Sequence, residues 1–213
     1  MSPRRTDKQR AAVISEAWYP HRDNYWVAAP GDAQRPFRYG DLFAPVAHSA
    51  SGQPLTTSSG QLWHAVMVLS PSCEVISKAG DDAAVEVARV MPLAAQDPKA
   101  AAAIVAGWQE KGGRTTVAFA HTVFLPGVAN TPSHVGGMFA NLKETVRIRM
   151  ADLRAAGRLG ALDHDARVAI IRRELYYRYR WLVTMEDVRA LEADRIGNDP
   201  YFTEPRPSWG QPQ

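Results

Sequence analysis

The stretch "LWHAVMVLS", residues 62–70, decides how the fold of this chain is interpreted. It is short, rich in valine and apolar on both of its faces, and a proline follows it directly. Such a run is typical of a strand buried at the centre of a sheet. Because side chains alternate along a strand, His64 and Val66 should lie on one face and Ala65 and Met67 on the other.

Other segments on either side of this run read as further strands and as helices. The expected strands are 35–49, 83–93, 114–127 and about 139–148. A helix is expected at 98–111, with Asp97 as its N-cap and a Gly-Gly pair after it. A second helix is expected at 162–182, with apolar residues spaced along one side. This apolar stripe comprises Val168, Ile171, Leu175 and Tyr179.

Several short strands followed by a C-terminal helix predict a mainly β fold with helices (α+β), built as a small barrel. We expect one domain at 37–182, with the helix at 98–111 inserted in it. An N-terminal extension at 1–36 precedes it, and a short helix with an irregular tail follows at 183–213. A chain of 213 residues is long enough to bury a sizeable core.

The bulk composition narrows the compartment and the chemistry. A single cysteine excludes an intramolecular disulfide and fits a reducing compartment. The basic start "MSPRRTDKQR" lacks the apolar region of a secretory signal, and no run reaches the roughly 20 apolar residues of a membrane span. We therefore expect a soluble, cytoplasmic protein. The common phosphate-loop, dinucleotide, serine-hydrolase and zinc motifs are absent, so neither cofactor nor metal is expected.

Positive charge gathers in one segment, between Lys143 and Arg180. It holds ten basic residues against five acidic ones, although the whole chain carries only +3. A basic surface attracts phosphate without regard to sequence. The alternative is an ordinary solvated helix face. The arginines chosen as candidates for nucleic-acid binding are Arg147, Arg149, Arg154 and Arg158.

Four residues are candidates for catalysis. Cys73 would be a nucleophile if a histidine approached it, and Glu74 beside it would be a general base. His64 and His121, both assigned to strands, would exchange protons near neutral pH. The alternatives are a small buried cysteine, a turn carboxylate and hydrogen-bonded histidines at the rim of the barrel. The C-terminal aromatic residues Tyr176, Tyr177, Tyr179 and Trp181 are expected mostly in the core, with base stacking as the alternative.

Several motifs together resemble the MazF/PemK-like toxin family. "YGDLFAPV" (39–46) is similar to its opening strand, "HAVMVLSP" (64–71) to its second motif and "VEVARVMPL" (85–93) to its third. Residues 138–175 resemble its final strand, turn and helix. The resemblance implies an SH3-like barrel, an endoribonuclease activity, and an antitoxin or a second copy of the chain as partner.

Two departures from the family pattern concern the implied catalytic groups. His64 stands where the family has an arginine that is implied to take part in catalysis, and Leu93 and Ala94 replace a Ser/Thr. The expected function is therefore a divergent RNA-binding or RNA-cleaving, toxin-like module. Two alternatives stay open, namely a non-catalytic interaction or regulatory module on the same barrel and a cysteine-dependent enzyme that uses Cys73.

Overall fold

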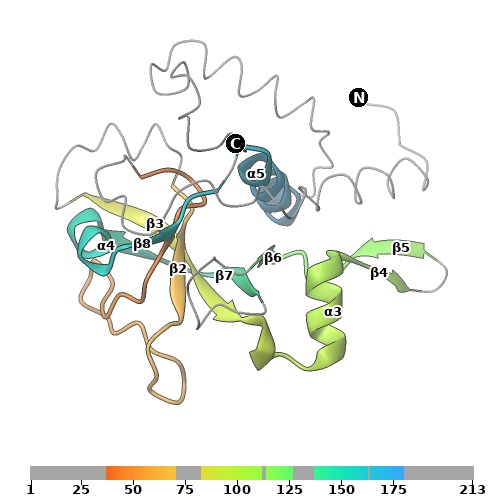
Figure 1. Cartoon of the computed structure of the whole chain (residues 1–213), viewed down its shortest axis with the longest axis horizontal. Coiled ribbons are helices and arrows are strands. Elements are labelled where there is room, and N and C mark those ends of the chain that lie inside the picture. Colours follow the sequence, from red (N-terminus) through yellow and green to blue (C-terminus); the bar gives the residue numbers. More distant parts are fainter. Residues whose placement is uncertain (1–36, 71–82, 112–113, 127–136, 163, 180–213) are drawn as a thin grey trace, which may run out of the picture.

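The computed structural model describes residues 37–70, 83–111, 114–126, 137–162 and 164–179 (Figure 1). These residues form a mixed α+β fold with an antiparallel six-stranded sheet, a separate two-stranded ribbon and three α-helices. The mainly β character expected from the sequence is confirmed at this level. The predicted extensions at 1–36 and 183–213 lie outside the described residues.

The six-stranded sheet has the order β6-β7-β3-β2-β1-β8, so β6 and β8 stand at its two ends. Every neighbouring pair is antiparallel. Its strands are β1 (Leu42–Phe43), β2 (Ala65–Val68), β3 (Ala84–Pro92), β6 (Thr122–Leu125), β7 (Met138–Arg149) and β8 (Arg158–Gly160).

The strand that the sequence placed at the centre of the sheet is an inner strand, β2. It pairs with β1 on one side and with β3 on the other, where Ala65 lies opposite Val90 and Val68 opposite Val87. All four of its residues are buried. The apolar pattern on both faces is therefore explained by two separate cores, one against each face of the sheet.

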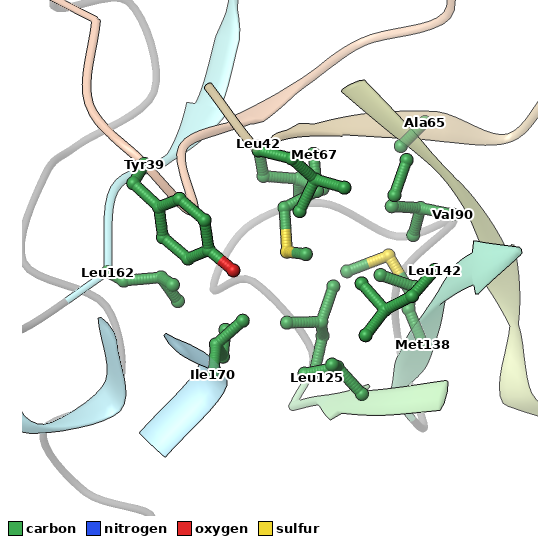
Figure 2. Close-up of a cluster of buried hydrophobic side chains, with 14 of the residues drawn as sticks. Tyr39, Leu42, Ala65, Met67, Val90, Leu125, Met138, Leu142, Leu162 and Ile170 are labelled. Atoms are coloured by element: carbon green, nitrogen blue, oxygen red, sulfur yellow. The ribbon is translucent and has the colours of Figure 1, made fainter. Parts of the chain in front are cut away.

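The first core lies between the sheet and α5 (His164–Tyr179). Figure 2 shows its side chains converging from the strands and from the helix, with Leu42, Met67 and Ile170 among those labelled. The second core lies on the opposite face, where Val66 and Val68 meet Leu153 of α4 (Met150–Ala156). In a smaller cluster, Ile104 of the helix Pro98–Ala106 packs against Phe139.

The inserted helix is shorter than the sequence predicted. As expected, Asp97 is the N-cap of α3 (Pro98–Ala106), and its carboxylate accepts hydrogen bonds from the backbone N–H groups of Lys99 and Ala100. It ends at Gly107, which adopts a left-handed conformation with φ 69°. The predicted last turn instead forms β4 (Trp108–Lys111), which pairs with β5 (Arg114–Val117) as the separate ribbon. Figure 1 shows this ribbon beyond α3.

The single strand predicted at 114–127 is two strands, β5 and β6, separated by a turn at residues 118–121. The helix α4 and the strand β8 were not predicted as elements at all. Both are short, and short elements give weak periodicity in a sequence. A short 3₁₀ turn, Leu93–Ala95, connects β3 to α3.

The apolar stripe predicted for α5 is only partly correct. Val168 is fully buried, whereas Tyr179 is 56% exposed. Arginines take up much of the buried face instead, since Arg167, Arg172 and Arg173 are all buried. The buried guanidinium of Arg167 donates to the backbone carbonyls of Tyr39 and Leu162, at 3.2 and 3.0 Å. These hydrogen bonds satisfy the donors of a guanidinium that is buried beside the predicted apolar stripe.

The described residues include no helix with both the length and the apolar composition needed to cross a membrane.

Candidate nucleic-acid interface

Three of the four candidate arginines are exposed near the end of β7 and on α4. Arg147 is exposed and donates to the backbone carbonyl of Ala84 at 2.8 Å. Arg149 is exposed but forms an ion pair with Asp152, with 2.9 Å between Nε and Oδ2. Arg154 lies on the surface of α4. These three side chains present positive charge over two consecutive elements of the chain.

The fourth candidate, Arg158, belongs to the interior. Its guanidinium lies 3.2 Å from a carboxylate oxygen of Asp41, and each of the two side chains is 1% exposed. The rings of Phe37 and Phe43 lie within 6 Å of the same guanidinium. Arg158 is therefore not part of the exposed basic surface, because its charge is used to compensate a buried carboxylate. Burial raises the pKa of Asp41 to about 6, although the charge of Arg158 and a hydrogen bond from the backbone N–H of Arg38 oppose this.

A hollow of about 580 Å³ adjoins Arg147. Its polar lining comes from Arg147 and from Ser49, Ser51 and Gln53 of a tight turn. The turn is well defined, because the backbone N–H of Ser49 donates to the carbonyl of Gln53 at 2.8 Å and that of Gln53 to the hydroxyl of Ser49 at 3.0 Å. A bond of 2.7 Å from the N–H of Ala50 to the carbonyl of Arg147 ties the turn to β7.

The hollow lies on a length of β7 that β6 does not cover. β6 pairs with Met138–Asn141 only. After Asn141 the register of β7 against β3 jumps to Thr145, so three residues, 142–144, form a bulge. The bulge contains the exposed Lys143, and its Glu144 is bonded to Arg89 at 2.6 Å and to the side-chain amide of Asn141 at 2.7 Å. These bonds give the bulge a fixed shape.

His121 lies in the turn between β5 and β6, so its assignment to a strand is wrong. Its ring contacts the rings of Phe119 and Tyr177 edge to face, with centroids 6.3 and 6.4 Å apart. Burial lowers the pKa of His121, and the positive charges of Lys143 and Arg173 lower it further. The imidazole is therefore neutral near pH 7.

His64 directly precedes β2, close to where the sequence placed it. It is half-buried, and its Nε2 atom is shielded from solvent. His64 precedes β2 and His121 precedes β6, and in the sheet β3 and β7 lie between these two strands. Because neighbouring strands lie about 4.8 Å apart, the two backbones are on the order of 14 Å apart across the sheet. The two histidines therefore belong to different parts of the surface.

The other two catalytic candidates, Cys73 and Glu74, lie outside the described residues. The nearest described residue before them is Ser70, the last residue of the apolar run 62–70. Its hydroxyl accepts a hydrogen bond of 2.9 Å from the backbone N–H of Glu86.

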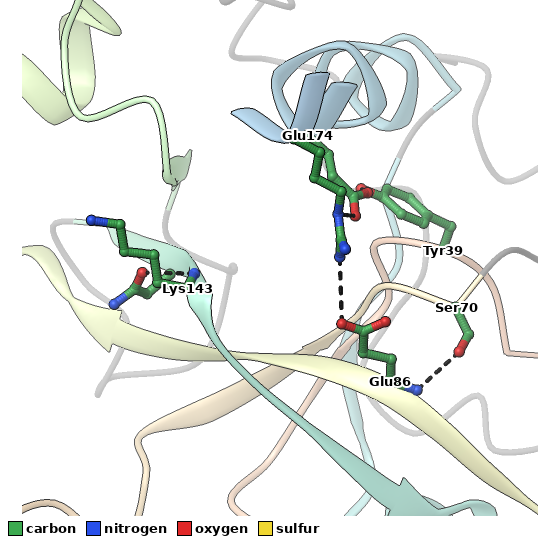
Figure 3. A network of polar contacts seen from close by, with 7 residues as sticks. Tyr39, Ser70, Glu86, Lys143 and Glu174 are labelled. Carbon is green, nitrogen blue, oxygen red and sulfur yellow. Dashed lines mark hydrogen bonds and ion pairs between the residues drawn. The ribbon is translucent and has the colours of Figure 1, made fainter. Parts of the chain in front are cut away.

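A polar network near Ser70 was not predicted from the sequence. The buried hydroxyl of Tyr39 donates to Glu174 at 2.5 Å, and the other oxygen of Glu174 accepts from Arg178 at 2.6 Å. Arg178 also reaches Glu86 of β3 at 3.4 Å (Figure 3). Burial and the neighbouring carboxylate raise the pKa of Tyr39 well above its ordinary value, so the phenol stays protonated. Tyr39 and Glu174 are 135 residues apart in sequence, and no local pattern could have paired them.

A second feature that the sequence did not reveal is the role of Arg173. From α5 this buried guanidinium donates to the backbone carbonyls of Gly107, Ala118, Phe119 and Thr122. Burial lowers its pKa to about 9, so the group keeps its charge at neutral pH. One side chain thereby holds the end of α3 and the turn before β6 against α5.

The described residues contain no group of three or more His, Cys, Asp and Glu side chains arranged to hold a metal ion. No protein-family model matches the chain, and no curated protein matches it.

Proposed function

We propose that this chain binds single-stranded RNA along the exposed length of β7. The observation that carries the proposal is the hollow beside Arg147, which joins an exposed guanidinium to the hydroxyls of Ser49 and Ser51. An RNA phosphate accepts hydrogen bonds. The guanidinium of Arg147 can donate to it, and so can one of the two hydroxyls, because the other donates within the 2.9 Å bond between Ser49 and Ser51. Arg149 and Arg154 add positive charge on the same end of the strand and on the following helix.

The charges of this surface differ in how much they contribute to binding. Arg147 donates to an uncharged backbone carbonyl, so this contact does not neutralise its positive charge. Arg149 already pairs with Asp152 and contributes less net attraction. Arg147 is therefore expected to dominate phosphate binding.

We also propose that the sheet is a divergent form of the SH3-like barrel of MazF/PemK-like toxins. Three features support this: β1, β2 and β3 follow one another as antiparallel neighbours, the long β7 pairs back onto β3, and α5 packs against one face of the sheet. The insertion of α3 with the β4–β5 ribbon before β6 sets this chain apart from a minimal barrel.

RNA binding is proposed here, and the test below also reports whether bound RNA is cleaved. The resemblance favours an endoribonuclease. Against this, the Nε2 atom of His64 is shielded from solvent, and two strands stand between the strands of His64 and His121. General acid–base cleavage needs two proton-transferring groups within reach of one phosphate. These two histidines do not supply such a pair.

The test is fluorescence anisotropy of a labelled single-stranded oligoribonucleotide, titrated with the full chain at several salt concentrations. For the wild type, the logarithm of the association constant should fall linearly with the logarithm of salt concentration. Arg147→Ala should weaken binding and make this slope shallower by about 0.7, the value expected for one lost contact with a single-strand phosphate.

A matched control is Lys99→Ala, which removes one exposed positive charge from the first turn of α3. It should leave affinity and slope unchanged. Absence of binding by the wild type, or equal effects of the two substitutions, would overturn the proposal and favour a protein-interaction module. A gel of the same oligonucleotide after incubation reports cleavage, and His64→Ala shows whether His64 takes part in any that occurs.

A further inference from the structure

The turn before β6 presents an aromatic ring on a strained backbone. Phe119 has φ 44°, and among the described residues it is the one non-glycine residue with a positive φ. Its side chain is 40% exposed, so the ring does not serve the core. Folding alone would favour glycine or asparagine at such a position, because a bulky side chain is disfavoured there.

The strained conformation is held from several directions. The carbonyl of Phe119 accepts hydrogen bonds from the backbone N–H of Thr122 at 2.7 Å, from the hydroxyl of Thr122 at 2.8 Å and from Arg173 at 2.9 Å. Arg173 itself is anchored in α5 and buried. Strain that the surrounding structure over-determines in this way is characteristic of functional positions.

The exposed ring has aromatic and cationic neighbours. His121 lies edge to face with Phe119, and Tyr177 of α5 with His121. Lys143, in the bulge of β7, is close enough to act electrostatically on His121. The backbone N–H of Leu142 donates to the carbonyl of His121 at 2.7 Å, which attaches the turn to β7. An aromatic face beside a positive charge is how proteins bind unpaired bases without sequence preference.

We propose that the ring of Phe119 stacks against an unpaired base, with Lys143 beside it for the adjacent phosphate and Arg173 as the positioning residue of the turn. The inference rests on the proposed RNA binding and adds a base-recognising subsite to it. Lys143 and Arg147 lie four residues apart on β7, about 13 Å if that length is extended. A single-stranded RNA that contacts the hollow at Arg147 can therefore extend along β7 to Lys143 and Phe119.

The experiment compares two substitutions of one residue on two probes. Phe119→Gly removes the ring and relieves the backbone strain, whereas Phe119→Trp keeps an aromatic face. The probes are a labelled oligoribonucleotide and an abasic oligonucleotide of equal length, which carries the phosphates alone. Anisotropy gives the affinity for each, and thermal unfolding shows whether each variant is folded.

Phe119→Gly is expected to weaken binding of the base-containing probe by about 5-fold or more and to leave binding of the abasic probe unchanged. Phe119→Trp should bind both probes like the wild type. The melting temperature of Phe119→Gly should be equal to that of the wild type or higher, because glycine suits φ 44°.

Each of the other outcomes contradicts either the stacking subsite alone or RNA binding as a whole. If Phe119→Gly binds both probes like the wild type while Arg147→Ala weakens both, the stacking subsite is wrong and the RNA-binding proposal stands. If Phe119→Gly weakens both probes equally, the ring acts on something other than a base and the subsite is again wrong. If the wild type binds neither probe, both proposals fail.

Discussion

At the scale of single residues, both the backbone conformation and a tertiary contact limit which residue can stand at Gly40. Its φ is +84°, a conformation that other residues adopt with difficulty. A Cβ atom at this position would lie 2.2 Å from Cδ1 of Leu162. Leu162 is fully buried in the first core, against which α5 packs. Backbone conformation and packing both demand glycine here.

Replacing Gly40 by alanine should therefore destabilise the protein by about 2–4 kcal/mol. About 1 kcal/mol comes from the left-handed backbone and the rest from the clash with Leu162. The free energy of unfolding, measured by urea denaturation, reports the change. Gly60→Ala is the matched control, because Gly60 has φ +79° and open space around its Cα. The control should cost only about 1 kcal/mol. Equal losses in the two variants would contradict the role assigned to Leu162.

At the scale of elements, α5 differs most from what its sequence indicates. Its apolar spacing predicted one apolar stripe facing the sheet, and the buried Val168 of that stripe agrees with the prediction. Arg167 and Arg173 are nevertheless buried on the same helix and donate to backbone carbonyls far along the chain. The helix thus joins the opening strand region to the turn before β6 by polar contacts as well as by packing.

Arg173→Met should destabilise the protein by about 3 kcal/mol or more. The substitution keeps much of the side chain's length but leaves several buried carbonyls without their donor. Arg178→Met on the same helix is the control, because Arg178 and its partner Glu86 are each 38% exposed, and its other partner Glu174, 15% exposed, keeps the hydrogen bond from Tyr39. That change should cost about 1 kcal/mol or less. Urea denaturation of both variants measures the two losses in the free energy of unfolding. A loss as large in Arg178→Met as in Arg173→Met would refute the special role of Arg173.

At the scale of the whole molecule, two cores sandwich the sheet. α5 covers one face, while α4 and the segment that contains Leu55 and Trp63 cover the other. The inner strands β2 and β3 are therefore protected on both faces and on both edges. The β4–β5 ribbon stands apart from this sheet and is joined to it through α3 and the turn at 118–121.

Native-state hydrogen exchange should reflect this arrangement. The amides of β2 and of the inner part of β3 should exchange only through global unfolding, because both strands are hydrogen-bonded on either side. Amides of the β4–β5 ribbon should exchange through local opening and therefore much faster. Exchange followed by mass spectrometry or NMR makes the comparison. Protection of the ribbon equal to that of β2 would contradict the division into a sheet and a peripheral ribbon.

The sequence by itself determined the elements whose signal is local. The apolar run at 62–70, the alternation at Val146 and Ile148 and the cap at Asp97 predicted β2, β7 and the start of α3 correctly. Each depends on residues that are neighbours along the chain. The end of α3 at Gly107 was missed because the Gly-Gly pair at 112–113 suggested a later end. The turn at Phe119 was missed because the apolar pattern of 114–127 continues through it.

Only the tertiary structure decided which charged residues face solvent. Arg147 and Arg158 look alike in the sequence, yet one lies exposed beside a hollow and the other is buried against Asp41. Likewise His64 and His121, which composition alone would group as one pair of acid–base candidates, follow strands separated by two others. The reason is physical: exposure, pKa and charge pairing depend on contacts between segments far apart along the chain, whereas strand and helix preferences are carried by adjacent residues.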